Sequence, residues 1–189
     1  VVQMMRDNLH ANAVPCNLPI GSEDGYQGVI DLVEGCEYIY NDDKGESFDK
    51  QDIQDENREV YEKYRAELME VAAESSDELL EEFLESGELS NEKLKKGLRD
   101  RTLSGEVVLT FSGTAFKNKG VQPLLDAVDH YLPSPEDKSE IVAQDENGDD
   151  LEINVLKTPD FSALAFKIMT DPFVGRLTYA RVYSGSIQA

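Results

Sequence analysis

The residue types best suited to binding a ligand gather in one loop, residues 112–119. Its hydroxyl side chains, Ser112 and Thr114, can donate and accept hydrogen bonds. An apolar run at residues 107–111 precedes the loop, and a helical pattern opens at Gly120. Ligands of open α/β sheets bind at the carboxyl ends of strands. The position therefore suits a binding loop as well as an ordinary strand-to-helix connection.

A strand and a helix must position this loop. A short strand covered on both faces is predicted by the run of Val107, Val108, Leu109 and Phe111. After the loop, apolar residues at helical spacing predict one buried stripe, formed by Val121, Leu124, Leu125 and Val128. Pro123 suits the first turn of that helix, and Pro133 ends it.

The chain has no residue pattern for phosphate binding or hydrolysis. It lacks Gly-x-x-x-x-Gly-Lys-Ser/Thr, and Asn118 and Lys119 do not continue as Asn-Lys-x-Asp. No Ser–His–Asp or Cys–His arrangement stands out in the sequence. Cys16 and Cys36 lack metal-site spacing and are predicted to be buried, reduced thiols. His130 is predicted to interact with the dipole at the end of its helix.

The amino-acid sequence of the loop resembles that of one known family. Residues 112–122 read Ser-Gly-Thr-Ala-Phe-Lys-Asn-Lys-Gly-Val-Gln, which is similar to the last guanine-recognition loop of elongation factor G, a translational GTPase. The usual sequence of this loop in that family is Gly-Ser-Ala-Phe/Leu-Lys-Asn-Lys-Gly-Val-Gln. The resemblance implies that Thr114, Ala115 and Phe116 bind the guanine of GTP or GDP. Thr114 replaces serine and adds a methyl group, so the backbone N–H of Ala115 is the firmer expected contact.

Further segments on both sides of the loop carry the same resemblance. Asn-Ala-Val-Pro at 12–15 and Gly-Val-Ile-Asp-Leu-Val at 28–33 resemble the start of an insert in that GTPase domain. Ala-Phe-Lys-Ile-Met-Thr-Asp-Pro-Phe-Val-Gly-Arg-Leu-Thr at 165–178 resembles the start of its second domain, a β-barrel. The resemblance thus spans essentially all 189 residues.

The resemblance implies an α/β fold with an α+β insert, followed by the first strands of a barrel. The GTPase domain would be a P-loop-type remnant without its phosphate loop. Its expected parts are a helix tail at 1–11, an insert subdomain at 12–104, and a last strand, guanine loop and helix at 105–133. An acidic linker at 134–160 and the barrel start at 161–189 would follow.

Local patterns predict the elements of the insert. Strands are expected at 14–20, 26–33 and 37–40, and helices at 55–74, from Ser75 to Gly87, and from Ser90 to Thr102. Weak strand character follows at 141–142 and 151–156, and a hairpin is expected within 161–189. The side chains predicted to face inward from the helices are Val60, Tyr64, Leu68, Val71, Leu79, Leu80, Phe83, Leu84, Leu94 and Leu98.

Charge separates the insert from the rest of the chain. Residues 41–90 hold 18 acidic and five basic residues, out of 39 acidic and 18 basic residues in all. This segment is either a solvated helix surface or a docking face for a basic partner. The resemblance implies that it meets the ribosomal stalk protein. It also implies that the locally basic barrel segment, with Lys167, Arg176 and Arg181, lies on ribosomal RNA.

Composition limits the remaining partners. A net charge of −21 repels DNA and anionic membranes, and no 18-residue apolar run exists. The first residues do not form a signal peptide, and the chain does not begin with Met, so we expect a piece of a longer cytoplasmic protein. The resemblance implies a fragment of a GTPase that drives tRNA–mRNA translocation and needs GTP with magnesium. The alternatives are a recycling or tetracycline-resistance type of ribosomal GTPase, and a non-hydrolysing acidic interaction module.

Overall fold

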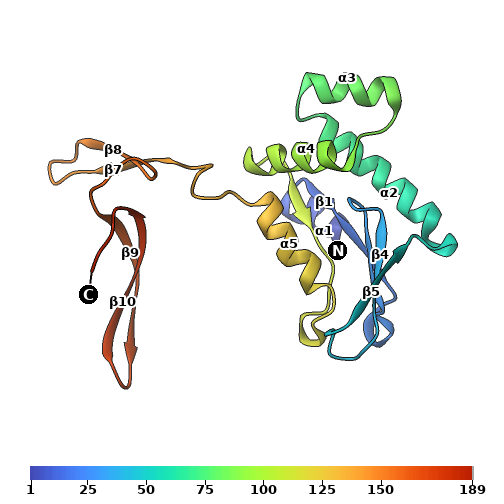
Figure 1. Ribbon diagram of the computed structural model, residues 1–189, viewed down its shortest axis with the longest axis horizontal. Helices are drawn as coiled ribbons and strands as arrows, with labels where there is room; N and C mark the ends of the chain where they lie inside the picture. The colour runs from blue at the N-terminus through green and yellow to red at the C-terminus, as the bar shows by residue number, and fades with distance from the viewer. Residues whose placement is uncertain (189) are drawn as a thin grey trace. The chain divides into compact units, whose positions relative to one another are not determined.

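Five α-helices and four small sheets make up residues 1–188, the part of the chain that the computed structural model describes (Figure 1). The fold is mixed α/β. Contacts divide the chain into two units, Val1–Leu132 and Pro133–Ala189.

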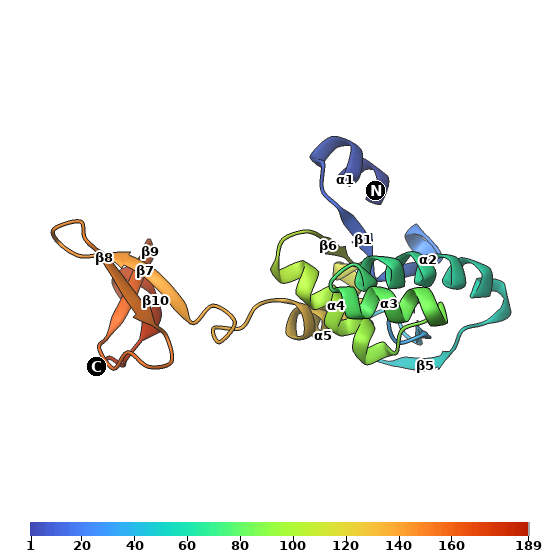
Figure 2. The ribbon, with the colours of Figure 1, turned by 90° about the horizontal axis from the view of Figure 1, so that it is seen from above.

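The first unit contains all five α-helices of the described residues. They are α1 (Val2–Leu9), α2 (Asp55–Ala73), α3 (Asp77–Ser86), α4 (Asn91–Leu103) and α5 (Val121–Tyr131). Helix α2 packs against α3 and α4, and α4 packs against α5 (Figure 1). Helix α1 has no buried residue and stands apart from the other helices in Figure 2.

Two sheets complete the first unit. One pairs β1 (Ala13–Pro15) with β6 (Val108–Thr110) in parallel. The other is antiparallel, in the order β2 (Asn17–Ile20), β3 (Gly28–Asp31), β4 (Cys36–Tyr40) and β5 (Phe48–Asp52). Two 3-10 turns, at Glu23–Gly25 and Ala115–Lys117, lie in the connections.

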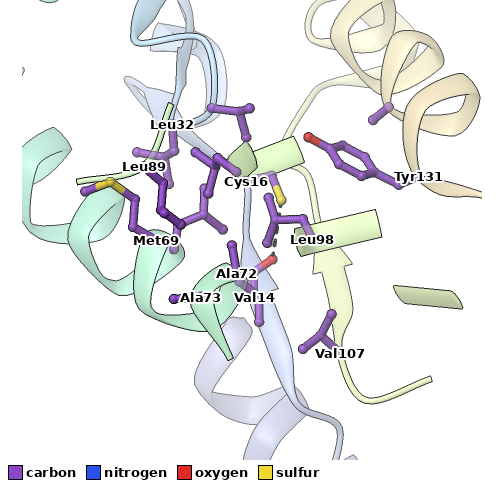
Figure 3. Packing of buried hydrophobic residues seen from close by; sticks show 14 of the residues in the cluster. Val14, Cys16, Leu32, Met69, Ala72, Ala73, Leu89, Leu98, Val107 and Tyr131 are labelled. Carbon is purple, nitrogen blue, oxygen red and sulfur yellow. Dashed lines mark hydrogen bonds between the residues drawn. The ribbon is translucent and has the colours of Figure 1, made fainter. Parts of the chain in front are cut away.

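The core of the first unit lies between the helices and the two sheets. Leu32, Leu68, Leu94 and Leu98 are almost completely buried there. In Figure 3, side chains from α2, α4 and β1 converge, and Tyr131 of α5 reaches the same cluster. Apolar residues of α2, α4 and β1 therefore hold the loop-bearing strand and helix in place.

The predicted strand at 14–20 is in fact two strands that belong to different sheets. The chain changes partners at Cys16, whose backbone N–H donates to Thr110 O and whose carbonyl accepts from Leu32 N. The predicted hairpin of 26–33 with 37–40 is confirmed as β3 and β4, with shorter bounds for β3. Strand β5 was not predicted, because its Phe-Asp-Lys-Gln-Asp sequence is too polar to show a strand pattern.

The three predicted insert helices are confirmed, but some of their expected inward residues are wrong. Leu68, Leu79, Leu94 and Leu98 are buried, whereas Leu84 is 74% exposed and Leu80 is also exposed. Helix α3 packs mainly against α2, so one side of it remains in solvent. In α2, Val60 is exposed and the buried residues lie toward the carboxyl end, at Leu68, Met69, Ala72 and Ala73.

The apolar stripe of α5 differs most from expectation. Leu124, Leu125 and Val128 are exposed, and Ala127 and Tyr131 are the buried residues of that helix. The strand before it is not covered on both faces either, since Val108 is 45% exposed. The reason is that the parallel sheet has two strands within residues 1–188, which leaves one side of both elements without a neighbour there.

The second unit consists of two antiparallel hairpins in its described residues. One pairs β7 (Glu140–Gln144) with β8 (Asp150–Asn154), where weak strand character was predicted. The other pairs β9 (Ser162–Asp171) with β10 (Gly175–Ser184), as expected for the end of the chain. These residues form no closed barrel. No helix in the described part of the chain has the length and apolar character to cross a membrane.

Candidate functional site

The loop at 112–119 leaves the carboxyl end of β6, as the sequence predicts. Parallel pairing sets Pro15 of β1 beside Thr110 of β6, and the backbone N–H of Cys16 extends this ladder to Thr110 O at 2.9 Å. The loop therefore begins where both parallel strands end, which is the edge at which α/β sheets bind ligands.

Backbone hydrogen bonds close the loop on itself. Thr114 and Lys119 form an antiparallel bridge, with N···O distances of 2.8 and 3.2 Å in the two directions. Between them the chain makes the 3-10 turn Ala115–Lys117, and Asn118 adopts a left-handed conformation with φ of 51°. This geometry brings the three predicted site residues together at the tip of the loop.

Each of these three residues keeps groups available for a ligand. Ala115 is the first residue of the 3-10 turn, so its backbone N–H has no partner within the turn. The side chain of Thr114 makes no capping hydrogen bond to that turn. Phe116 is fully exposed, and an aromatic ring of this kind can cover the face of a planar ligand. The tip thus offers one N–H donor, one hydroxyl and one ring.

Asn17 fixes the base of the loop. Its side chain is almost completely buried, and its Oδ1 accepts from the backbone N–H (2.6 Å) and the hydroxyl (3.0 Å) of Ser112. Its Nδ2 donates to the Ser112 carbonyl at 3.3 Å. The sequence reasoning missed this residue; the only signal was a polar side chain within the apolar run at 14–20.

Two tyrosines, Tyr40 of β4 and Tyr26 just before β3, lie against the other end of the loop. The hydroxyl of Tyr40 accepts from the backbone N–H of Gly120 at 2.7 Å and donates to Gln122 Oε1 at 2.8 Å. Gly120 has φ of 82°, and a Cβ there would lie 3.1 Å from the hydroxyl of Tyr26. Burial raises the pKa of Tyr26 to about 12 and raises that of Tyr40 as well. Both hydroxyls therefore keep their protons at neutral pH.

A cavity of about 930 Å³ adjoins the first residues of the loop. Residues of α1, β2 and α2 line it together with Asn17, Ser112 and Gly113. This volume is within the range of small-molecule sites. No group of three or more His, Cys, Asp or Glu side chains in residues 1–188 is arranged to hold a metal ion.

A separate feature is the acidic surface, which we define as the exposed carboxylates of α2, of α3 and of Glu74 between them. Its members are Asp55, Glu56, Glu59, Glu62, Glu67, Glu70, Glu74, Asp77, Glu78, Glu81 and Glu85. Within the part of the chain that the structure describes, only some of this charge is paired. Glu74 contacts Arg101, and Asp55 lies 3.7 Å from Arg58. Most of the acidic surface can therefore attract a basic partner.

The chain is similar to a protein from Thermus thermophilus whose crystal structure is known. The two share 28% sequence identity with a TM-score of 0.71, over 97% of this chain and 24% of that protein. The chain thus spans about a quarter of the length of that relative. No model of a known protein family matches the chain. The likeness supports the fold over nearly the whole chain.

Proposed function

We propose that this chain is part of a translational GTPase resembling elongation factor G, and that its loop binds the guanine of GTP or GDP. The observation that carries the proposal is the loop itself. The loop follows the carboxyl end of a parallel strand pair, and the Ala115 N–H lies at its exposed tip. Its sequence is Ser-Gly-Thr-Ala-Phe-Lys-Asn-Lys-Gly-Val-Gln.

The available groups suit guanine rather than adenine. Guanine carries the acceptor O6 where adenine carries an amino donor. A backbone N–H such as that of Ala115 can donate to O6 but finds no acceptor at the same place on adenine. The hydroxyl of Thr114 can serve as a second donor, and Phe116 can cover the ring. The loop would therefore select the base and leave the phosphates to other groups.

Residues of this chain do not suit the rest of a nucleotide site. The sequence has no phosphate-binding loop, and its described residues form no carboxylate cluster for magnesium. Magnesium would neutralise phosphate charge in such a GTPase. We propose that those groups belong to other parts of a longer protein. The exposed apolar side of β6 and α5 supports this view, because parallel sheets are normally covered on both faces.

The coding sequence that contains this chain provides the first test. A phosphate-binding loop and Asn-Lys-x-Asp encoded upstream of Val1, together with ribosome-stimulated GTP hydrolysis by the gene product, would support the proposal. Absence of both motifs would exclude a GTPase and leave the non-hydrolysing acidic module as the better function. Translocation and ribosome-splitting assays of the same product would separate the translocation factor from recycling and tetracycline-resistance relatives.

The acidic surface favours a second element of the proposal, a basic partner such as the ribosomal stalk protein. Screening within a Debye length of about 8 Å at physiological salt predicts binding that weakens as salt rises. Reversing Glu78 and Glu85 to lysine should weaken it further, whereas Asp129→Lys on α5 should change it less. Titration of the chain with stalk protein at low salt measures this. No binding at low salt would remove the partner from the proposal.

A further inference from the structure

The turn that joins β4 to β5, residues 41–47, packs directly on the loop although it lies more than 70 residues away in sequence. The carbonyl of Gly45 accepts hydrogen bonds from Gln122 Nε2 at 3.0 Å and from Asn118 Nδ2 at 3.3 Å. Gly45 is buried, and a Cβ there would lie 2.5 Å from the carbonyl oxygen of Lys117. Only a residue without a side chain allows the two backbones to come this close.

The same turn is held rigid by its own hydrogen bonds. The Oδ1 of Asp42 accepts from Lys44 N at 2.7 Å, and its Oδ2 accepts from Ser47 N at 2.7 Å. The backbone N–H of Asn41 also donates to Ser47 O at 3.0 Å. The turn is therefore braced by its own hydrogen bonds in addition to its contacts with the loop.

Tyr40 connects this support to the loop through a single hydroxyl group. It is only 7% exposed, and its oxygen bonds both the Gly120 backbone and the Gln122 side chain. Gln122 in turn donates to Gly45. Tyr40, Gln122 and Gly45 thus form one hydrogen-bonded chain that ends on the residues following the Thr114–Lys119 bridge.

We infer that Tyr40 and the turn at 41–47 are positioning elements for the base-contacting tip, so that the insert sets part of the affinity for the nucleotide. The identity of the ligand rests on the proposed function, whereas the shaping of the loop does not. The physical reason is preorganisation: a loop already held in its bound shape loses less conformational entropy on binding. None of these positioning residues lies at the exposed tip.

Amide hydrogen exchange of the full chain tests the shaping of the loop. Tyr40→Phe deletes one oxygen and keeps the buried ring. The informative amides are Thr114 and Lys119, because they bond each other and not Tyr40. Loss of one net hydrogen bond predicts exchange that is about 2- to 10-fold faster at both. Tyr38→Phe is the matched control, since in residues 1–188 its hydroxyl makes no hydrogen bond to the loop.

A second variant tests whether the change in exchange comes from breaking the hydrogen-bonded chain and not from the Tyr40 substitution itself. Gln122→Ala breaks the same hydrogen-bonded chain from the helix side and should accelerate the same two amides. Unchanged exchange at Thr114 and Lys119 in both variants would overturn the inference. Equal acceleration by Tyr38→Phe would also overturn it, because the effect would then be a general loosening of β4.

Binding of GDP by the gene product that contains this chain tests the second part of the inference, that the shape of the loop affects nucleotide affinity. Tyr40→Phe should raise its Kd for GDP by a similar factor, about 2- to 10-fold. A looser loop with unchanged GDP affinity would overturn the positioning role. A wild-type product that binds no guanine nucleotide would refute the proposed ligand, while the exchange experiment would still decide whether the insert shapes the loop.

Discussion

At the scale of single residues, buried and part-buried polar side chains tie the first unit together through hydrogen bonds. Arg65 shows this clearly, with one guanidinium nitrogen donating to the carbonyls of Leu32 and Val33 and another donating to Asn91. Glu37 is 1% exposed and has no cationic partner among the described residues. Such groups contribute mainly through the cost of removing one partner, because the other is left buried and unpaired.

Replacing Glu37 should therefore destabilise the first unit strongly. Its carboxylate accepts from Gln51 Nε2, Gln54 N and Asn57 Nδ2 at 3.0, 3.1 and 2.9 Å. Glu37→Ala removes these three hydrogen bonds to a buried carboxylate and should lower the free energy of unfolding by about 2–4 kcal/mol. Urea unfolding followed by helical circular dichroism measures this. Glu59→Ala, at an exposed site, should change stability by less than about 0.5 kcal/mol. Equal effects would show that Glu37 is not a structural centre.

Asp31 predicts a pH dependence of stability. Burial raises its pKa above the usual value, although the N–H groups of Glu34 and Val33 oppose this. Asp31 therefore loses its proton at a lower pH in the unfolded chain than in the folded chain. As pH rises from the unfolded pKa through the folded pKa, the free energy of unfolding falls, because ionising the buried carboxyl is unfavourable. Asp31→Asn keeps the acceptor and removes the charge. It should be more stable than wild type at pH 7, with the advantage vanishing below about pH 4. A constant advantage at all pH values would refute this account, and Asp129→Asn is the control.

At the scale of elements, the N-terminus of α3 shows that the capping residue in the structure can lie one position from the residue that the sequence pattern predicts. The sequence pattern places the cap of α3 at Ser75. The structure assigns it to Ser76, whose hydroxyl accepts from Leu79 N at 3.3 Å. The hydroxyl of Ser75 is buried without a hydrogen-bond partner in residues 1–188. The caps at Ser90 and Gly87 follow the prediction.

The two adjacent serines provide a matched pair for measurement. Ser76→Ala removes a capping acceptor and should cost about 1 kcal/mol of stability. Ser75→Ala removes a buried hydroxyl that has no partner in the described residues and should be neutral or slightly stabilising. Thermal or urea unfolding of both variants compares them directly. A larger loss of stability for Ser75→Ala than for Ser76→Ala would show that Ser75 is the capping residue, as the sequence pattern predicts.

The hairpin of β9 and β10 is predicted to be the least protected part of the described chain. Two strands alone are marginal in water, and Leu164, Phe166 and Ile168 are all more than half exposed. Its pairing also contains register shifts, one of them between Tyr179 and Ala180. Amide exchange in a monomeric sample should be much faster there than in β3 and β4. Equal protection of the two hairpins would contradict the prediction.

At the scale of the whole molecule, charge and the missing phosphate site determine what the chain can bind alone. The net charge of −21 repels a polyanionic nucleotide. The tip of the loop offers one or two hydrogen bonds to a base, each worth about 0.5–1.5 kcal/mol net. Even millimolar affinity requires about 4 kcal/mol. The proposed function therefore requires phosphate-binding groups that these 189 residues do not supply.

We accordingly expect no measurable binding of GTP or GDP by this chain. Isothermal titration with magnesium present tests the expectation, with the longer gene product as the positive control. A Kd below about 100 μM, equivalent to about 5.5 kcal/mol, would show that the nucleotide site has been misplaced. Binding by neither protein would instead count against the GTPase proposal itself.

The sequence by itself determined the elements whose signals are local. Helical spacing located α2, spacing together with capping residues located α3 to within one residue and α4, and turn residues located the hairpins. The apolar run followed by Ser-Gly-Thr placed the loop correctly between β6 and α5, with Thr114, Ala115 and Phe116 adjacent at its tip. These features depend on neighbours within a few residues, so a single sequence contains the information.

Tertiary structure alone decided the features that depend on distant partners. Strand β5 exists because β4 pairs with it. The α5 stripe is exposed because the neighbouring parallel sheet has two strands within the described residues. The anchoring of the loop by Asn17 and Tyr40 joins residues 95 and 80 positions apart. Periodicity reports which face of an element is apolar, but not which neighbour covers that face. A buried hydrogen bond between distant side chains leaves no local pattern in the sequence, and it appears only when the chain has folded.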